Sequence, residues 1–160
     1  MTIKAGEKIP QATLLKATPE GPQPVDTDSF FAGRKVALFS VPGAFTPTCS
    51  ARHLPGYVER AGDLKGKGID EVACVAVNDA FVMQAWGQQA GADGKVTMLA
   101  DGNGDFAKAL GLTMDASKFG MGTRGQRWSA IVEDGVVSAL NIEEPGAFSV
   151  SGAEHLLGQL

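Results

Sequence analysis

Two short apolar runs constrain the fold of this chain more than any other feature. Lys35–Val41 (KVALFSV) and Glu71–Val77 (EVACVAV) carry apolar residues at nearly every position rather than at alternate ones. Runs of this length and composition predict strands that are buried on both faces. Such strands belong to largely parallel sheets that are covered by helices on each side. The sequence therefore predicts an α/β fold.

The rest of the chain alternates helix and strand patterns around these runs. We expect a helix over 50–68 kinked at Pro55, a helix over 78–91 capped by Asn78 or Asp79, a strand over 95–101, a short helix over 104–112, a hairpin over 126–144 turning at Asp134–Gly135, and a final helix opened by a capping box from Ser151 to Glu154. The proline-rich stretch 16–28 predicts a surface loop. With 160 residues and no repeat, the chain is expected to be one domain over 1–160, with a central mixed sheet flanked by helices.

Composition and charge narrow the possible functions. The formal net charge of −4 and the pI near 5.1 argue against a surface for nucleic acid or an anionic membrane. No stretch is long and apolar enough to span a bilayer, and MTIKAGEKIPQ lacks an apolar signal core, which favours a cytoplasmic location. The two cysteines do not make a disulfide framework, so each is either an inert core residue or chemically active. They and the two histidines are widely scattered, and no metal or other cofactor is expected.

Cys49 lies where the strand over 35–41 ends and the next helix begins, in the stretch VPGAFTPTCS. Ligands of α/β sheets bind at such strand ends. The first turn of a helix has unpaired N–H groups that favour an anion, so a thiol there is favoured as thiolate. Thr46 or Thr48 is expected to cap this helix. The alternative is that Cys49 is a small residue of the core.

The residues before Cys49 predict a rigid loop. Pro42 and Pro47 fix φ, and Gly43 lets the backbone approach a ligand closely. The spacing TPTC puts Thr46 where a C-x-x-C exchange motif has its first cysteine. A hydroxyl group that can form hydrogen bonds thus replaces a resolving thiol, which disfavours a disulfide reductase.

The stretch PGAFTPTCS, followed by RHLPGYVERA, resembles the peroxiredoxin family, and within it the peroxiredoxin 5 or type II branch. The similarity continues through VNDAFVMQAW, LADGNGDFAKALGL, GTRGQRWSAIVEDG and ALNIEEPGAFSVSGAEHLL, so it covers nearly the whole chain. It implies a thioredoxin-like fold with an N-terminal extension. It also implies an antioxidant enzyme that reduces hydrogen peroxide and organic hydroperoxides with a cysteine thiolate.

The resemblance also implies roles for individual residues. Cys49 matches the peroxidatic cysteine, which attacks a peroxide oxygen and becomes a sulfenic acid. The remaining matches are Pro42, Thr46 and Arg127 at catalytic positions. In the same loop, Gly43 and Phe45 are expected to bind the substrate, and Arg124, on the segment of Arg127, is expected to support the site. Ionisation of the thiol alone accelerates the reaction too little, so the larger contribution is expected from donors such as Arg127 that stabilise charge across the O–O bond. The alternative for Arg127 is a solvated charge at a strand end.

Cys74 lies within the apolar run EVACVAV, which predicts that it is buried. The alternative is a resolving thiol that forms a disulfide with Cys49. In animal peroxiredoxin 5 enzymes the resolving cysteine lies in the region matching EEPGAFSVSG, where this chain has Ser149, Val150 and Ser151. The resemblance to plant and bacterial type II enzymes therefore implies an external reductant, either glutathione with glutaredoxin or thioredoxin.

Four further interpretations remain at this point. His53, four residues after Cys49, could form the dyad of a cysteine hydrolase, although no third group is evident. The stretch 102–107 (GNGDFA) matches a dinucleotide fingerprint but is better explained as a turn and helix cap. A peroxide-sensing relay without sustained turnover would use the same thiol as a peroxidase. The resemblance also implies a homodimer, with Phe45, Phe81 and Trp86 near its interface or, alternatively, in the core.

Overall fold

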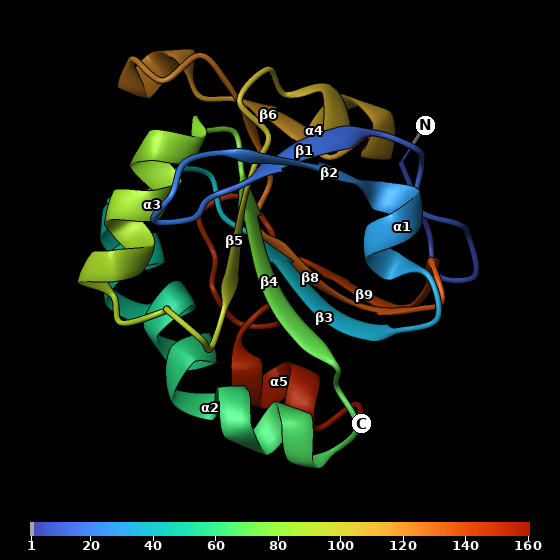
Figure 1. Cartoon of the computed structure of the whole chain (residues 1–160). Helices are drawn as coiled ribbons and strands as arrows, with labels where there is room; N and C mark the ends of the chain where they lie inside the picture. Colours follow the sequence, from blue (N-terminus) through green and yellow to red (C-terminus); the bar gives the residue numbers. More distant parts are fainter. Residues whose placement is uncertain (1) are drawn as a thin grey trace.

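The structure, a computed structural model, describes residues 2–160. Its centre is a seven-stranded sheet with the order β2-β1-β5-β4-β3-β8-β9 (Figure 1). The strands are β1 (Thr13–Lys16), β2 (Gln23–Asp26), β3 (Lys35–Ser40), β4 (Glu71–Ala76), β5 (Thr97–Ala100), β8 (Trp128–Glu133) and β9 (Val136–Ile142). The three central strands β3, β4 and β5 run parallel, and the outer strands pair antiparallel. The predicted mixed sheet is confirmed.

Helices cover both faces of this sheet. The helices are α1 (Thr27–Phe31), α2 (Leu54–Gly66), α3 (Ala80–Gln89), α4 (Asp105–Leu110) and α5 (Ala153–Leu157). One core cluster joins α2, α3 and α5 to one face, and a second joins α1 and α4 to the other. Successive residues of β3 alternate between the clusters: Ala37 and Phe39 in the first, Val36 and Leu38 in the second. Burial on both faces is the physical reason for the uninterrupted apolar runs.

The expectation of a surface loop over 16–28 is wrong. Strands β1 and β2 pair as an antiparallel hairpin, with Leu15 opposite Pro24, and α1 follows directly. A proline lacks an N–H group for the sheet, but β2 is an edge strand, where one side of the backbone has no neighbour in the sheet. The small sheet of β6 (Thr113–Asp115) and β7 (Thr123–Gly125), with a 3₁₀ turn over Ser117–Phe119 between them, was also not predicted.

The helix ends differ in part from the sequence predictions. The segment after the loop over 42–48 forms a π-helix over Cys49–His53, and Pro55 lies in the first turn of α2, where proline is common. Asp79 caps α3, as predicted, because its carboxylate accepts from Val82 N–H at 2.8 Å. The capping box at Ser151 is wrong. Gly152 is the N-cap of α5 and has no side chain to form a capping bond.

At the edge strand β9, the N-terminal segment forms additional backbone hydrogen bonds. Gly6 N–H donates to Val137 C=O at 2.7 Å, and Val137 N–H donates to Glu7 C=O at 2.9 Å. Ile9 N–H donates to Gly135 C=O at 2.8 Å. The first residues of the chain therefore cover the start of this edge.

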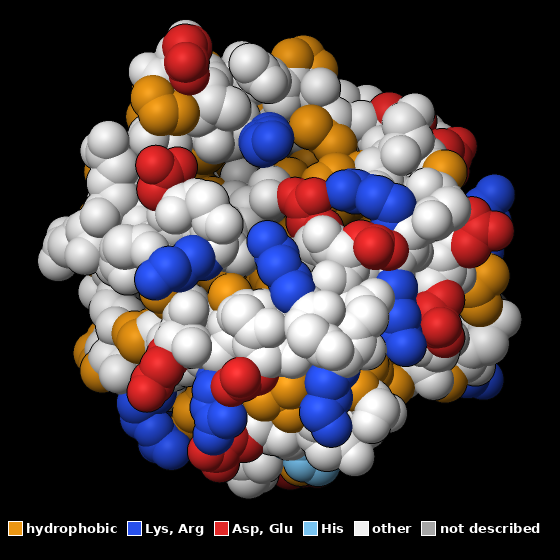
Figure 2. Space-filling view, turned by 60° about the horizontal axis from the view of Figure 1, so that its bottom comes forward, with side chains coloured by type: hydrophobic (Ala, Val, Ile, Leu, Met, Phe, Trp, Pro, Cys, Tyr) orange, Lys and Arg blue, Asp and Glu red, His pale blue; other side chains and the backbone are white. Residues whose placement is uncertain are grey.

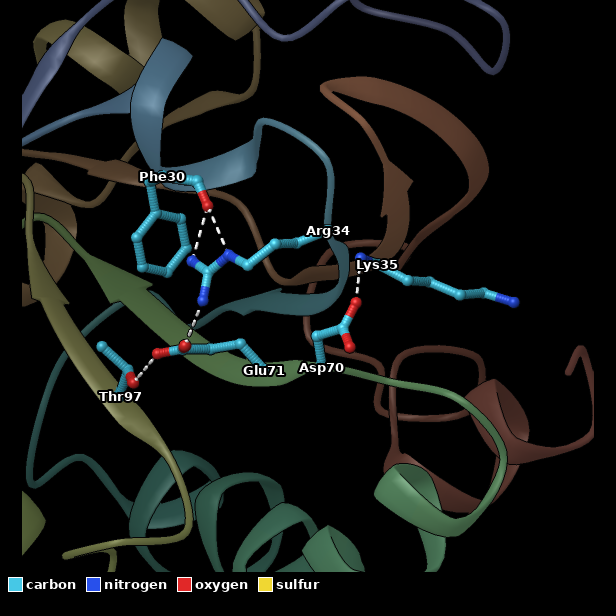
Figure 3. A network of polar contacts seen from close by, with 6 residues as sticks. All are labelled: Phe30, Arg34, Lys35, Asp70, Glu71 and Thr97. Atoms are coloured by element: carbon cyan, nitrogen blue, oxygen red, sulfur yellow. Dashed lines mark hydrogen bonds and ion pairs between the residues drawn. The ribbon is translucent and has the colours of Figure 1, made fainter.

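A network of hydrogen bonds and an ion pair connects residues at the amino ends of the parallel strands (Figure 3). Arg34 Nη1 lies 2.6 Å from Glu71 Oε1 at the start of β4, and its Nε donates to Phe30 C=O at 2.9 Å. Glu71 also accepts from the Thr97 hydroxyl on β5. This network ties α1 to two strands at the end of the sheet opposite Cys49, which follows the carboxyl end of β3.

The surface carries charges of both signs. Figure 2 shows Lys and Arg side chains interspersed with Asp and Glu on the face that it presents. A nucleic-acid surface instead gathers basic residues on one face. Among residues 2–160, no helix has the length and apolar character needed to cross a membrane.

Candidate active site

Cys49 is buried at the start of the π-helix, with none of its surface exposed, and its thiol is free. The loop that leads to it is held by polar contacts. Ala44 N–H donates to Asn78 Oδ1 at 2.9 Å, and the Thr46 hydroxyl donates to Gly43 C=O at 2.6 Å. Phe45 lies between them in the left-handed region with φ 65°, and its side chain is 46% exposed. The loop thus has the fixed conformation expected of a preorganised site.

The threonines do not cap the helix, contrary to expectation. Thr48 is its N-cap residue but forms no side-chain capping bond. The single hydroxyl proton of Thr46 is used on Gly43 C=O, so toward a ligand this oxygen acts as an acceptor.

Gly43 is closely packed, and a side chain there would require the flexible end of Met121 to shift. A Cβ atom there would lie 2.9 Å from Met121 Cε and 3.2 Å from Thr46 Cγ2. Arg124 braces the same region: its Nη1 donates to Val77 C=O at 2.9 Å and its Nε to Met121 C=O at 2.9 Å. Arg124 therefore links the loop before β7 to the end of β4, in keeping with the supporting position expected for it.

Arg127, between β7 and β8, reaches the sulfur directly. Its Nη2 donates to Cys49 Sγ at 3.1 Å, and its Nη1 lies 2.8 Å from His53 Nδ1. The Phe148 ring lies 5.8 Å from the guanidinium carbon. A positive charge at this distance stabilises a thiolate and any negative charge that develops beside it.

His53 is fully buried, and both of its ring nitrogens are occupied. Nε2 lies 3.0 Å from Ser151 C=O, which only accepts, so Nε2 carries the proton. Nδ1 is therefore the acceptor for Arg127. Burial, and secondarily the positive charge of Arg127, lowers the pKa of His53 to about 3, so the ring is neutral. This arrangement leaves no free base for Cys49, which removes the cysteine-hydrolase interpretation.

The sequence did not reveal the roles of Ser151, Tyr57 and Glu143, which hold His53 on the side away from Arg127. Ser151 C=O also accepts from the Tyr57 hydroxyl at 2.8 Å. The turn that holds this carbonyl is bound by the buried carboxylate of Glu143. Glu143 Oε2 accepts from the N–H groups of Ser149, Val150 and Ser151 at 2.8 Å each and from the Ser151 hydroxyl at 2.7 Å. No pattern in the sequence separates Glu143 from Glu144 beside it.

The hydrogen bonds keep Glu143 ionised. Burial by itself would raise the pKa of this carboxyl group, but the bonds from Ser149, Ser151 and Val150 outweigh it and lower the pKa to about 2. The carboxylate is therefore charged at any physiological pH.

Cys74 lies on β4 opposite Phe39 of β3, and the predicted burial is confirmed. Burial, and secondarily the proximity of Cys49, raises the pKa of the Cys74 thiol well above its usual value of 9.0. This thiol is therefore neutral and a poor nucleophile.

The dinucleotide interpretation finds no support in the geometry. The amides of Phe106 and Ala107 at the start of α4, which would bind a phosphate, donate to the Asp101 carboxylate at 3.1 and 2.9 Å. Within residues 2–160, no three His, Cys, Asp or Glu residues are grouped so that they could hold a metal ion.

Comparison with known proteins agrees with this geometry. The Redoxin family model matches residues 4–157. Peroxiredoxin-2E-2 of Oryza sativa subsp. japonica, a chloroplastic protein, is 50% identical over 99% of this chain and 73% of its own length. Peroxiredoxin-2B of Arabidopsis thaliana is 42% identical over 99% of this chain and 98% of its own. The chain belongs to the peroxiredoxin family.

These relatives place the peroxiredoxin in the type II branch. The structure of reduced Prx3 from Vibrio vulnificus in complex with H₂O₂ has a TM-score of 0.95 and 51% identity, covering 99% of each chain. The thioredoxin-like fold expected from the resemblance is thereby confirmed. As a peroxiredoxin, the protein is a thiol-dependent peroxidase.

Proposed function

We propose that this peroxiredoxin reduces hydrogen peroxide and alkyl hydroperoxides through a sulfenic acid at Cys49, and that an external thiol resolves it. The observation that carries this proposal is the buried Cys49 sulfur with Arg127 Nη2 at 3.1 Å. Buried donors of fixed geometry stabilise developing charge far better than water does.

In the first step the Cys49 thiolate attacks the distal oxygen of the peroxide. The S–O bond forms as the O–O bond breaks, Cys49 becomes a sulfenic acid, and the alkoxide or hydroxide that leaves takes a proton from solvent. The Arg127 guanidinium stabilises the charge that moves between sulfur and oxygen. The Thr46 oxygen, whose own proton is held by Gly43 C=O, accepts from the peroxide O–H group. Gly43 and the partly exposed Phe45 belong to the same loop and would contact the substrate.

The second half of the cycle uses a thiol from outside the chain. The sulfenic acid and an external thiol form a mixed disulfide and water, and a second thiol releases Cys49. The neutral, buried Cys74 is a poor candidate for this attack, and the turn over 149–151 contains no cysteine. Glutathione with glutaredoxin, or thioredoxin, would supply the thiol.

Burial of Cys49 sets a condition on this step. Even a peroxide needs an opening about as wide as a water molecule, which Cys49 with no exposed surface does not offer in this conformation. A mixed disulfide asks for more, because it brings a whole second molecule within about 2.05 Å of the sulfur. The segment over 49–53 must therefore move for resolution. Its π-helical winding is the less stable form of a helix turn, which favours such a movement.

We also propose a homodimer, which would cover the exposed aromatic side chains near the site. Phe45 is 46% and Phe81 is 72% exposed. Trp86 is only 2% exposed, so of the two expected places, the interface and the core, it lies in the core. Phe81→Glu is expected to shift sedimentation toward the monomer, and an unchanged dimer would argue against this interface.

Intact mass of the reduced protein after one equivalent of tert-butyl hydroperoxide, with and without glutathione, tests the peroxidase proposal. We expect one added oxygen that glutathione converts to an adduct, with Cys49→Ser unreactive. Loss of two hydrogens within one chain would instead make Cys74 the resolving thiol. A single oxidation without repeated turnover, with glutaredoxin or thioredoxin present, would favour the sensing relay.

A further inference from the structure

Glu143 is linked to the reacting sulfur by a continuous series of polar contacts. Its carboxylate binds the turn over 149–151, and the carbonyl of Ser151 at the end of this turn faces His53 Nε2 at 3.0 Å. His53 Nδ1 accepts from Arg127 Nη1 at 2.8 Å, and Arg127 Nη2 donates to Cys49 at 3.1 Å. The Ser151 carbonyl and the His53 ring are uncharged, and the Glu143 carboxylate does not contact the sulfur. The Arg127 guanidinium is therefore the charged group of this series that acts on Cys49 directly.

We propose that Glu143 is a positioning residue for the peroxidase reaction, which acts by fixing the turn Ser149–Ser151 so that His53 aims the Arg127 guanidinium at Cys49. The inference rests on the proposed role of Cys49 and Arg127. It adds a residue that touches neither the peroxide nor the sulfur.

The chemistry of the turn explains why an acid is needed. Three successive N–H groups, those of Ser149, Val150 and Ser151, converge on one oxygen of Glu143. Successive amides form a concave site that suits an anion, and charged acceptors form the stronger hydrogen bonds. Without the carboxylate these donors would lose their common acceptor, and the buried N–H of Ser151 would have no partner unless the turn rearranged to reach water.

The turn over 149–151 also determines the orientation of the His53 imidazole. A neutral histidine presents one donor and one acceptor at fixed positions on a flat ring, so the direction of Nδ1 follows from the bond that Nε2 makes. The Phe148 ring, in the same segment, packs 4.9 Å from the His53 ring. A displaced turn would therefore rotate or shift His53, and the guanidinium would lose its second point of attachment.

Two other hydrogen bonds predict that the effect is partial. Ser151 C=O also accepts from Tyr57, and the backbone N–H of Glu143 donates to Arg127 C=O at 3.0 Å. These bonds do not use the carboxylate and remain when it is removed. Loss of an oxyanion donor itself costs 10²–10³-fold in rate, so a misplaced Arg127 should cost less, roughly tenfold.

The test measures the rate of Cys49 oxidation by hydrogen peroxide in stopped flow, read by tryptophan fluorescence. Trp86 Nε1 donates to the Ser50 hydroxyl at 2.9 Å, next to Cys49, and is well placed as a reporter. Glu143→Ala is expected to react roughly tenfold slower, and Glu143→Gln, which keeps the shape and one acceptor oxygen, roughly threefold slower. Glu144→Ala removes an exposed neighbouring acid and is the matched control, with an unchanged rate.

A double-mutant cycle separates positioning from general damage to the fold. If Glu143 acts through Arg127, then Glu143→Ala or Glu143→Gln should cause no further loss of rate in an Arg127→Ala background. Equal losses in both backgrounds, or a wild-type rate in Glu143→Ala, would overturn the inference. If Glu143→Ala does not fold, the Glu143→Gln cycle decides alone. Failure of the wild-type protein to react with peroxide would instead overturn the proposed function.

Discussion

Removing the Arg127 guanidinium should slow the reaction of the Cys49 thiolate itself, beyond any change in how much thiolate is present. At 3.1 Å, full opposite charges attract by about 5 kcal/mol at an effective dielectric constant of about 20. Only the part of this attraction that grows in the transition state affects the rate. Loss of one such donor typically costs 10²–10³-fold, or about 3–4 kcal/mol. Arg127→Ala is expected to fall in this range.

The competing explanation is that Arg127 serves only to ionise the thiol. A free thiol is a few per cent ionised at neutral pH, so full ionisation accounts for about 30-fold at most, and this advantage disappears once the pH is high enough to ionise any thiol. Second-order rate constants for hydrogen peroxide should therefore be measured by stopped flow from neutral to alkaline pH, with the ultraviolet absorbance of the thiolate followed in parallel.

We expect Arg127→Ala to remain about 10²-fold slower than wild type where both are fully ionised. Arg127→Lys should lose nearly as much, because a single ammonium group cannot contact both Cys49 Sγ and His53 Nδ1 as the planar guanidinium does. The control is Arg60→Ala, which removes an arginine engaged with Asp63 and Glu154 on the surface. If the rates of Arg127→Ala and wild type converge at alkaline pH, charge stabilisation by Arg127 is refuted.

Three further predictions concern buried groups and the far end of the sheet. Cys74→Ala should leave peroxide oxidation and turnover with an external thiol unchanged, since the Cys74 thiol is buried and neutral; lost turnover in the coupled assay would contradict this. His53, whose pKa is lowered from 6.5 to about 3 by burial and by Arg127, stays neutral where the unfolded chain binds a proton, so stability is lost as the pH falls below about 6.5. Urea unfolding at about pH 5 should give a free energy about 2 kcal/mol below that at about pH 7.5, with the difference reduced in His53→Gln and retained in the control His155→Gln. Arg34→Ala should lower the free energy of unfolding by about 1–2 kcal/mol, through loss of the contacts to Glu71 and Phe30, with no change in peroxide rate; a slower reaction would show coupling between the two ends of the sheet.

The sequence predicted those parts of the fold that depend on local pattern. The uninterrupted apolar runs identified β3 and β4, because a strand buried on both faces needs apolar residues at successive positions. The hairpin of β8 and β9 was predicted from Asp134 and Gly135, and both adopt positive φ, 48° and 79°. The strand β2 was missed because proline weakens the local signal, and only pairing with β1 reveals that the position is an edge.

The candidate site shows the same division. The loop before Cys49 is contiguous, so its prolines, glycine and threonine are recognisable together. The contacts behind Arg127 join residues far apart along the chain: His53 and Ser151 are separated by 98 positions, and Arg127 and His53 by 74. No spacing rule relates such positions. The tautomer of His53 and the charge of Glu143 follow only from the partners that the fold provides.

The covered edges of the sheet have a consequence for self-association. An exposed edge strand is a template on which further strands add, and such growth leads to aggregates. Here β2 presents Pro24 at one edge, and at the other the residues from Gly6 to Ile9 occupy hydrogen-bonding groups at the start of β9. Deleting residues 2–9 would uncover backbone groups of Gly135 and Val137 next to an apolar strand. We therefore expect this deletion to promote growth of the sheet from one molecule to the next along β9.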